Sequence, residues 1–205
     1  MARVTPRVEL LAWGGVVGPA AFVGSWAIAG AVTASYSAVN NAISDLAAVD
    51  ASTHVAMTAG FVVYGLGLTA FGIALRQVLQ GRAWMAAIAT GGCTLGVAAT
   101  PLGGWSGDAV HATFAGLGYA AIVALPLLAA SPLARTGRSG WARVSVLTGT
   151  ISATCLFAST FGPAHGLFQR LGLTVGDVWI VATASALFAA MKSAPSSRGH
   201  YGEVP

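Results

Sequence analysis

The chain has 205 residues, of which 56% are hydrophobic and only 8% are charged, and its mean hydropathy is +0.75. This composition excludes a water-soluble domain, in which roughly a quarter of the residues are normally charged. Ten basic residues outnumber six acidic ones, but they are scattered between apolar runs instead of forming one patch. We therefore expect an integral membrane protein, surrounded by membrane lipid, with no nucleic-acid partner.

Long apolar runs separated by short polar segments predict six membrane-spanning helices. The first run follows Arg3 and Arg7 and is longer than the roughly 7 to 15 residues of a signal-peptide core, so we interpret it as a retained span. About 20 apolar residues are enough to cross a bilayer as a helix. The predicted spans cover about residues 10–34, 54–75, 83–103, 110–131, 144–162 and 173–191.

These spans predict an all-α six-helix bundle formed by a single domain, residues 1–192. A tail at 193–205, rich in Ser, Pro and Gly, is expected to be disordered. Six spans place both termini on one side, which then holds nine of the ten basic residues, whereas Arg170 lies on the other side. By the positive-inside rule the basic side is cytoplasmic. The chain is thus expected to be a multi-pass plasma-membrane protein with both termini and the tail in the cytoplasm.

Small residues inside the spans predict close helix packing. Gly14 with Gly18, and Gly92 with Gly96, have the four-residue spacing that brings two helix backbones together. The only two cysteines, Cys93 and Cys155, lie in apolar runs, where a thiol behaves as a small hydrophobic group. Neither a disulfide nor a thiolate metal site is expected.

All four aspartates and three of the four histidines fall on the extracytoplasmic side of this topology. Asp50 and His54 are four residues apart, and Asp108 and His111 are three apart, so each pair would share one helix face. Both pairs could point into the bundle. Alternatively, the aspartates only cap helix N-termini and the histidines only form local hydrogen bonds.

Asp177 is expected to lie inside the bundle. Its distance from Lys192 along a helix is about 22 Å, which is less than the roughly 30 Å of the hydrocarbon core. One of the two must therefore sit at membrane depth, and a short aspartate cannot reach the surface as a lysine can. Arg170 is the predicted partner of Asp177, in an ion pair that would be either functional or only structural.

Three histidines beside aspartates are able to form a tetrahedral zinc site with an open position for water. Under this hypothesis the zinc ligands are His54, His111 and His165. The catalytic groups that act on the water or the oxyanion are Ser44, Asp45, Asp108 and Asp177. The groups that contact a lipid or lipid-like substrate are Asn41, Gln169 and Arg170, the last through an anionic head group.

The protein would then be a metal-assisted hydrolase of a lipid or lipid-like substrate. Two alternatives stay open at this point. The same groups bind or transport a lipid or small molecule without chemistry, or the bundle is a structural or regulatory partner of another membrane protein. Whether the protein is an enzyme, which ligand it takes and its oligomeric state are not determined by the sequence.

Three stretches resemble a known family: YSAVNNAISDLAA at 36–48, the Asp108 and His111 pair, and HGLFQRLGL at 165–173. They resemble the bacterial and archaeal membrane family known as domain of unknown function 998. The resemblance covers nearly the whole chain, with ISDL at 43–46 and GLFQR at 166–170 as its most specific parts. It implies the six-span fold and topology but no activity.

Two looser similarities point toward lipids. The ISD element also resembles one in six-span proteins of the Frag1/DRAM/Sfk1 type, which are linked to lipid handling. The Ser, Asp and His cluster is similar to that of the alkaline ceramidase and adiponectin-receptor superfamily of seven-span zinc amidases, although this chain has one span fewer and no HxxxH motif on its last helix.

Overall fold

The computed structural model describes residues 6–192, and this part of the chain is helical, without β-strands. Arg3 and the predicted tail at 193–205 lie outside the described residues. The α-helices are α1 (Pro6–Ala12), α2 (Gly14–Val32), α3 (His54–Val78), α4 (Ala83–Ala99), α5 (Asp108–Arg135), α6 (Ser139–Ala158) and α7 (His165–Lys192). A short 3-10 helix, η1 (Ile43–Ala47), lies between α2 and α3. The predicted all-α class is confirmed.

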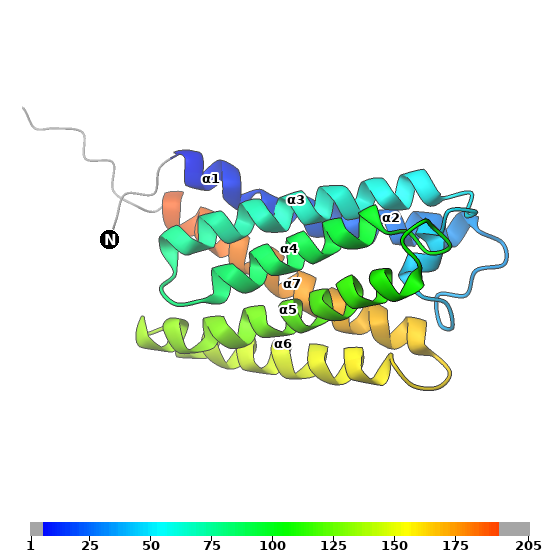
Figure 1. Ribbon diagram of the computed structural model, residues 1–205. Helices are drawn as coiled ribbons and strands as arrows, with labels where there is room; N and C mark the ends of the chain where they lie inside the picture. The colour runs from blue at the N-terminus through cyan, green and yellow to red at the C-terminus, as the bar shows by residue number, and fades with distance from the viewer. Residues whose placement is uncertain (1–5, 193–205) are drawn as a thin grey trace, which may run out of the picture.

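The helices form an up-and-down bundle (Figure 1). From α2 to α7 each helix packs against the next in sequence, and α7 closes the ring by packing against α2. Both ends of the described chain lie at the same end of the bundle (Figure 1). We call this the basic end, because it carries Arg7, Arg76, Arg82, Arg135, Arg138 and Arg143. We call the opposite end, with Asp45, Asp50 and Asp108, the acidic end.

Five helices are long and apolar enough to cross a membrane: the α1 and α2 pair at Pro6–Val32, α3, α5, α6 and α7. The remaining helix, α4, is equally apolar but has only 17 residues. It packs between α3 and α5, so it returns the chain from the basic end to the acidic end. The described fold therefore contains five candidate spans and one shorter apolar helix.

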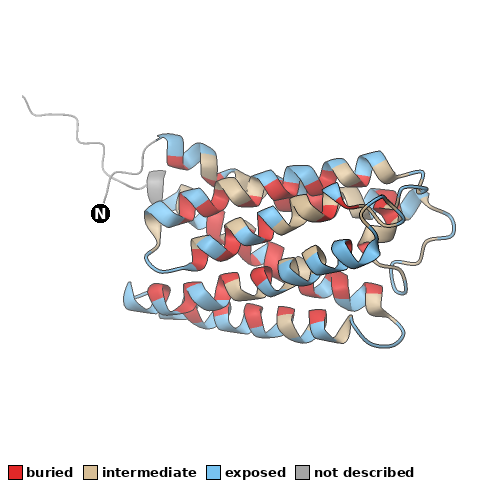
Figure 2. Ribbon diagram, viewed as in Figure 1, coloured by how far each residue is buried: buried red, intermediate tan, exposed pale blue. Residues whose placement is uncertain are grey.

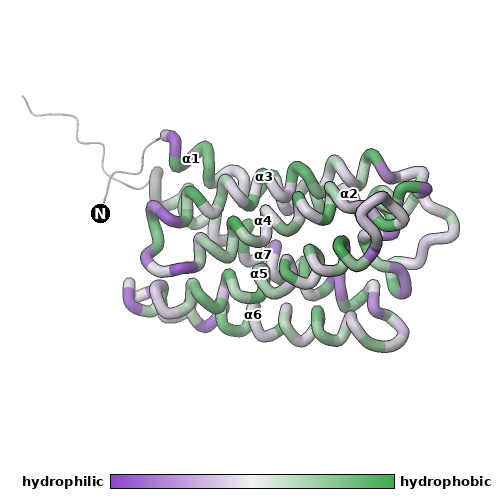
Figure 3. Tube along the Cα trace, in the orientation of Figure 1, coloured by the Kyte–Doolittle hydropathy of each residue, from purple (hydrophilic) through white to green (hydrophobic). Residues whose placement is uncertain are grey.

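The side chains are sorted between the inside of the bundle and its lipid-facing surface (Figure 2). Leu68 and Phe71 of α3, with Ile122 and Leu125 of α5 and Ile180 of α7, are fully buried. Large apolar side chains are exposed on the outside instead, as in Leu66, Leu147 and Phe157. Hydrophilic residues gather at the two ends (Figure 3). This distribution is the one that an apolar surrounding favours.

Close glycine contacts join neighbouring helices, though not all at the predicted positions. Gly14 and Gly18 of α2 pack on the backbone of Gly67 in α3, and a Cβ atom on Gly14 would collide with the Gly67 carbonyl oxygen. This confirms the first predicted pair. The prediction for Gly92 is wrong, because nothing lies within 4 Å of its Cβ position, and Gly91 makes the close contact with α3 instead.

Candidate functional site

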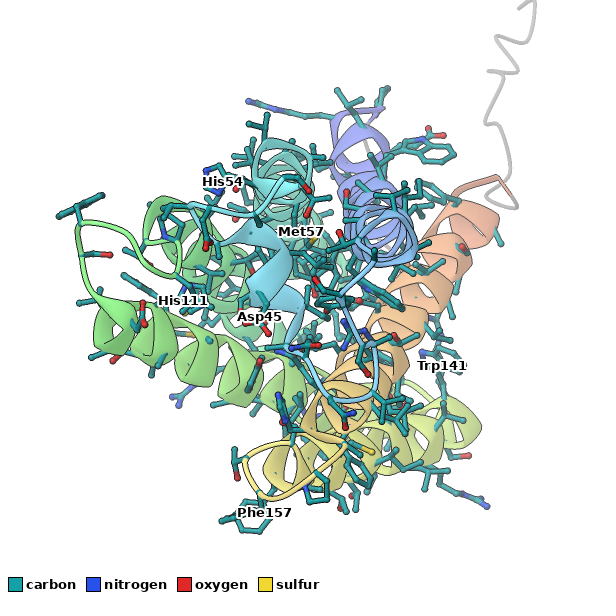
Figure 4. The ribbon with its side chains drawn as sticks, turned by 90° about the vertical axis from the view of Figure 1, so that its right-hand side faces the viewer. Asp45, His54, Met57, His111, Trp141 and Phe157 are labelled. Carbon is teal, nitrogen blue, oxygen red and sulfur yellow. The ribbon has the colours of Figure 1, made fainter. Side chains whose placement is uncertain are left out.

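Two segments that are far apart in sequence are bound to each other at the acidic end. The 36–43 loop, which joins α2 to η1, lies on the first turns of α7 (Figure 4). The amide of Leu167 donates to the Val39 carbonyl oxygen at 3.0 Å. Gly166 packs so closely on the Asn41 carbonyl that a Cβ atom would not fit. Two of the stretches that resemble the family, 36–48 and 165–173, therefore contact each other.

Arg170 is the centre of this contact. Its side chain is only 5% exposed, and its Nη1 donates to the carbonyl oxygens of Ala38 and Asn41 at 2.9 Å and of Gly166 at 2.8 Å. The guanidinium also lies over the Trp26 ring, with its Cζ atom 5.2 Å from the ring centroid. Carbonyl dipoles and an aromatic face thus balance the charge where an aspartate was expected.

Tyr36 completes the surroundings of Arg170. Its hydroxyl accepts a hydrogen bond from Nη2 of Arg170 and donates to the Ala42 carbonyl oxygen at 2.8 Å. Burial raises the pKa of the Tyr36 hydroxyl above its ordinary value, and the neighbouring guanidinium only partly offsets this. The hydroxyl therefore keeps its proton at neutral pH and remains both a donor and an acceptor.

Gln169 links η1 to α5. Its Oε1 accepts the backbone amide of Ile43 at 2.8 Å, and its Nε2 donates to the Tyr119 hydroxyl. Both polar ends of this buried amide are therefore occupied by protein groups. Asn41, which was also predicted to contact the substrate, is likewise bonded to protein groups. Its backbone carbonyl accepts from Arg170, and its Oδ1 accepts the Ser37 amide at 2.8 Å.

Asp177 lies inside the bundle, as predicted from its distance to Lys192. It is 2% exposed, and its Oδ1 accepts a hydrogen bond of 2.8 Å from the Tyr64 hydroxyl of α3. Its Oδ2 has no hydrogen-bond partner. The predicted ion pair with Arg170 is therefore wrong: the guanidinium is taken up by the 36–43 loop, and Asp177 is paired with a neutral hydroxyl on another helix.

The predicted zinc ligands do not form one cluster. The Nδ1 of His54 is 2.7 Å from the Ala47 carbonyl oxygen, and the Nδ1 of His111 is 2.7 Å from that of Thr100. Figure 4 shows these two histidines at separate helix ends, and His165 begins α7. Within residues 6–192 no group of three or more His, Cys, Asp or Glu is placed to hold a metal ion.

The acidic residues of the acidic end also act locally. Asp45 accepts the Ala42 amide at 3.0 Å, and Asp108 accepts the Gly103 amide at 2.9 Å, so each closes its own loop. Asp50 is exposed in the turn before α3. Asp45 thereby binds the N-cap amide of η1, whereas neither α3 nor α5 has a side-chain cap, so the capping role considered for Asp50 and Asp108 is not found. The catalytic roles of Asp45, Asp108, Asp177 and Ser44 stay predictions.

A cavity lies beneath η1 and Gln169, inside the bundle. Its empty volume is about 530 Å³, part of which is open to the outside, and it is lined by residues of α2, η1, α3, α4, α5 and α7. Apolar walls come from residues such as Phe22, Phe61 and Phe114. Its polar lining residues are Ser44, Tyr64, Thr90, Thr94, His111, Tyr119 and Gln169. This lining contains no Lys, Arg, Asp or Glu.

Sequence reasoning missed most of this cavity. Tyr64, Thr90, Thr94 and Tyr119 lie in apolar runs, where hydroxyl-bearing residues are common and do not by themselves mark a site. Of the predicted site residues, only Ser44, His111 and Gln169 line the cavity. Asp177 does not line the cavity, but it accepts a hydrogen bond from the hydroxyl of Tyr64, which does.

Replacing Arg170 should release the 36–43 loop. In Arg170→Gln the carbonyl oxygens of Ala38 and Asn41 lose their buried donor, so we expect the free energy of unfolding to fall by about 2–4 kcal/mol. Amide hydrogen exchange at residues 36–47 should accelerate, and thermal unfolding in detergent should shift downward. Arg82→Gln, at an exposed position, is the matched control and should change neither. Unaltered exchange in Arg170→Gln would contradict the role given to this side chain.

Tyr64→Phe and Asp177→Asn should differ in their effect on stability. Tyr64→Phe removes the hydroxyl that donates a hydrogen bond to Asp177, and should lower the free energy of unfolding by about 1–3 kcal/mol. In Asp177→Asn the amide oxygen still accepts the Tyr64 hydroxyl and no charge is buried, so stability should be unchanged or higher. Thermal unfolding of both variants checks this. An Asn variant as unstable as the Phe variant would mean that the carboxylate charge itself is needed.

A family model described as "Protein of unknown function (DUF998)" matches residues 16–186. No curated protein and no solved structure matches the chain. The matched range runs from α2 into α7 and includes both the 36–43 loop and the Gln169 and Arg170 segment that holds it. The chain therefore belongs to the DUF998 family.

Proposed function

We propose that this protein binds a lipid-like amphiphile in the cavity beneath η1, without changing it chemically. The observation that carries the proposal is the cavity itself, which lies inside an apolar bundle and has aromatic walls and a few hydrogen-bonding groups. Ligand sites in proteins commonly have this mixture of groups. The apolar walls would surround a hydrocarbon segment, and the polar groups would orient the head group.

The chemistry of the lining favours a neutral polar head group. Tyr64, Tyr119, Thr90 and Thr94 offer hydroxyls, and His111 offers an imidazole, but the lining has no basic side chain to hold a phosphate. Arg170, the cation expected for that purpose, is buried and bonded to protein carbonyls. A glycerol or other hydroxyl-bearing head group fits these groups best.

Binding is favoured over passage through the bundle. Between the cavity and the basic end, the interior is filled by Leu68, Phe71 and Leu125, each 0% exposed. A hydrolase with three histidine ligands is less well supported than binding, because residues 6–192 contain no cluster of His, Cys, Asp or Glu placed to hold a metal. The cavity then acts as a pocket with one closed end.

We further infer that the chain crosses the plasma membrane six times, with both termini in the cytoplasm. At 17 residues, α4 reaches the lower end of the range of about 17–25 residues found for spanning helices. Its place between α3 and α5 also supports a crossing. The arginines of the basic end, on the α3–α4 and α5–α6 connections, support a cytoplasmic location of that end.

Cysteine labelling tests this topology directly. In a background with Cys93 and Cys155 replaced by alanine, single cysteines are placed at the exposed positions Ala38, Arg82 and Trp105. On intact cells a membrane-impermeant maleimide should label Ala38→Cys and Trp105→Cys, and should label Arg82→Cys only after the cells are opened. If Arg82→Cys and Trp105→Cys behave alike, α4 does not cross the membrane.

A photoreactive monoacylglycerol tests the ligand site. The full-length protein in detergent should be cross-linked by this probe at residues of α4 and α5 that line the cavity, and excess unlabelled monoacylglycerol should compete. Ala115→Trp should reduce the labelling at least about fivefold, since a residue that lines the cavity then fills it. Ala120→Trp, on the exposed side of the same helix, is the matched control and should label normally.

Two results would contradict the binding proposal. Equal labelling of the Ala115→Trp and Ala120→Trp proteins would show that the probe reacts only with the lipid-facing surface. Release of the fatty acid from the probe, lost in His111→Ala, would instead support the hydrolase.

A further inference from the structure

A second cavity opens at the basic end, lined by residues of α3, α5, α6 and α7. Its empty volume is about 800 Å³, part of which is open to the outside. Most of its lining is aliphatic, as in Leu75, Leu133 and Leu187, and Trp141 of α6 contributes an aromatic side chain. Two polar residues, Arg138 and Thr183, also line it. This cavity has no part in the amphiphile site at the other end of the bundle.

Arg138 brings a positive charge to the rim of this cavity. It is exposed and stands at the N-cap position of α6, where no side chain caps the helix. The first amide groups of a 20-residue helix therefore face the same region as the guanidinium. Uncapped helix N-termini favour anions, and a guanidinium binds phosphate oxygens well. All four aspartates lie away from this end: Asp45 in η1, Asp50 in the turn before α3, Asp108 at the start of α5 and Asp177 within α7.

Thr183 adds an unpaired hydroxyl inside the cavity wall. Its side chain is 6% exposed and its Oγ1 has no hydrogen-bond partner. Thr69, Thr90 and Thr94, in contrast, each donate to a carbonyl one turn earlier in their own helix. A buried hydroxyl without a partner is costly in apolar surroundings. An acceptor supplied by a bound molecule would remove that cost.

The cavity continues into a groove between α6 and α7. Trp141 and Ala182 line both, and the groove extends over Val144, Val178 and Thr174. Val144 is 41% exposed and Val178 is 62% exposed, so the groove lies on the lipid-facing surface. The polar rim with the Arg138 guanidinium therefore adjoins an apolar surface groove. This groove runs along α6 and α7 away from the basic end.

We propose that this cavity and groove hold one phospholipid with an anionic head group, taken from the leaflet at the basic end. The phosphate lies at Arg138 and the α6 N-terminus, an ester oxygen accepts from Thr183, and an acyl chain follows the α6–α7 groove. Basic pockets between membrane helices bind anionic lipids through this combination of charge and apolar surface.

Native mass spectrometry of the full-length protein in detergent tests the proposal. The protein is titrated with dioleoyl phosphatidylglycerol or dioleoyl phosphatidylcholine. We expect one equivalent of phosphatidylglycerol to be held more tightly than phosphatidylcholine. Arg138→Gln should weaken phosphatidylglycerol binding about fivefold and leave phosphatidylcholine unchanged. Arg82→Gln, at the same end but outside the cavity lining, is the matched control and should change neither.

A second variant tests the cavity without altering charge. Ala186 lines the cavity at an exposed position, so Ala186→Phe should block the site while the helix content stays unchanged by circular dichroism. It should weaken the binding of both lipids. Equal losses in Arg82→Gln and Arg138→Gln, full binding by Ala186→Phe, or displacement of the lipid by glycerol 1-phosphate at equal concentration would each overturn the proposal.

Discussion

The acidic end of the bundle depends on the guanidinium of Arg170, which is buried against the carbonyl oxygens of the 36–43 loop. An irregular loop has carbonyl groups that no helix pairs, and leaving them without partners near a membrane is costly. A guanidinium carries five donors in a rigid fork, so one side chain can satisfy several carbonyls and hold the loop on α7. Arg170 binds the carbonyls through Nη1 and the Tyr36 hydroxyl through Nη2, whereas a lysine would offer only a single nitrogen. The position of η1 over the bundle interior follows from this contact.

The cavity is covered by η1 and has no arginine in its lining because of the hydrogen bonds that Arg170 and Gln169 make within the protein. Gln169 pairs with the Ile43 amide and the Tyr119 hydroxyl, so it fixes η1 as the cover of the cavity. Arg170 is bonded to loop carbonyls and does not line the cavity. What remains toward the cavity are hydroxyls, one amide and one imidazole. Such groups orient a ligand by hydrogen bonds, whereas charged groups would have selected a ligand of the opposite charge.

Hydropathy predicted the helices and their alternation well, because a bilayer requires long apolar runs and the chain has few charges to interrupt them. Hydropathy did not predict which side chains bond to each other or which helix faces meet. Tyr64 lies in an apolar run 113 positions from Asp177, and its sequence context does not show that its hydroxyl faces a carboxylate. The spacing of Gly92 and Gly96 likewise did not fix the face of α4 that meets α3, since one residue turns a helix by about 100°. Sorting His54, His111 and His165 to one side predicted the end of the bundle at which they lie but not their separation.

The two ends of the bundle treat positive charge in opposite ways. At the acidic end the one described arginine is buried and bonded within the protein. At the basic end Arg138 is exposed, and the lining that surrounds it is almost entirely apolar. A buried guanidinium that binds loop carbonyls stabilises the chain and is hidden from lipids. An exposed guanidinium beside this cavity finds few acceptors in the protein, because the cavity lining is almost entirely apolar. The fold therefore uses arginine for structure at one end and leaves it available to the surroundings at the other.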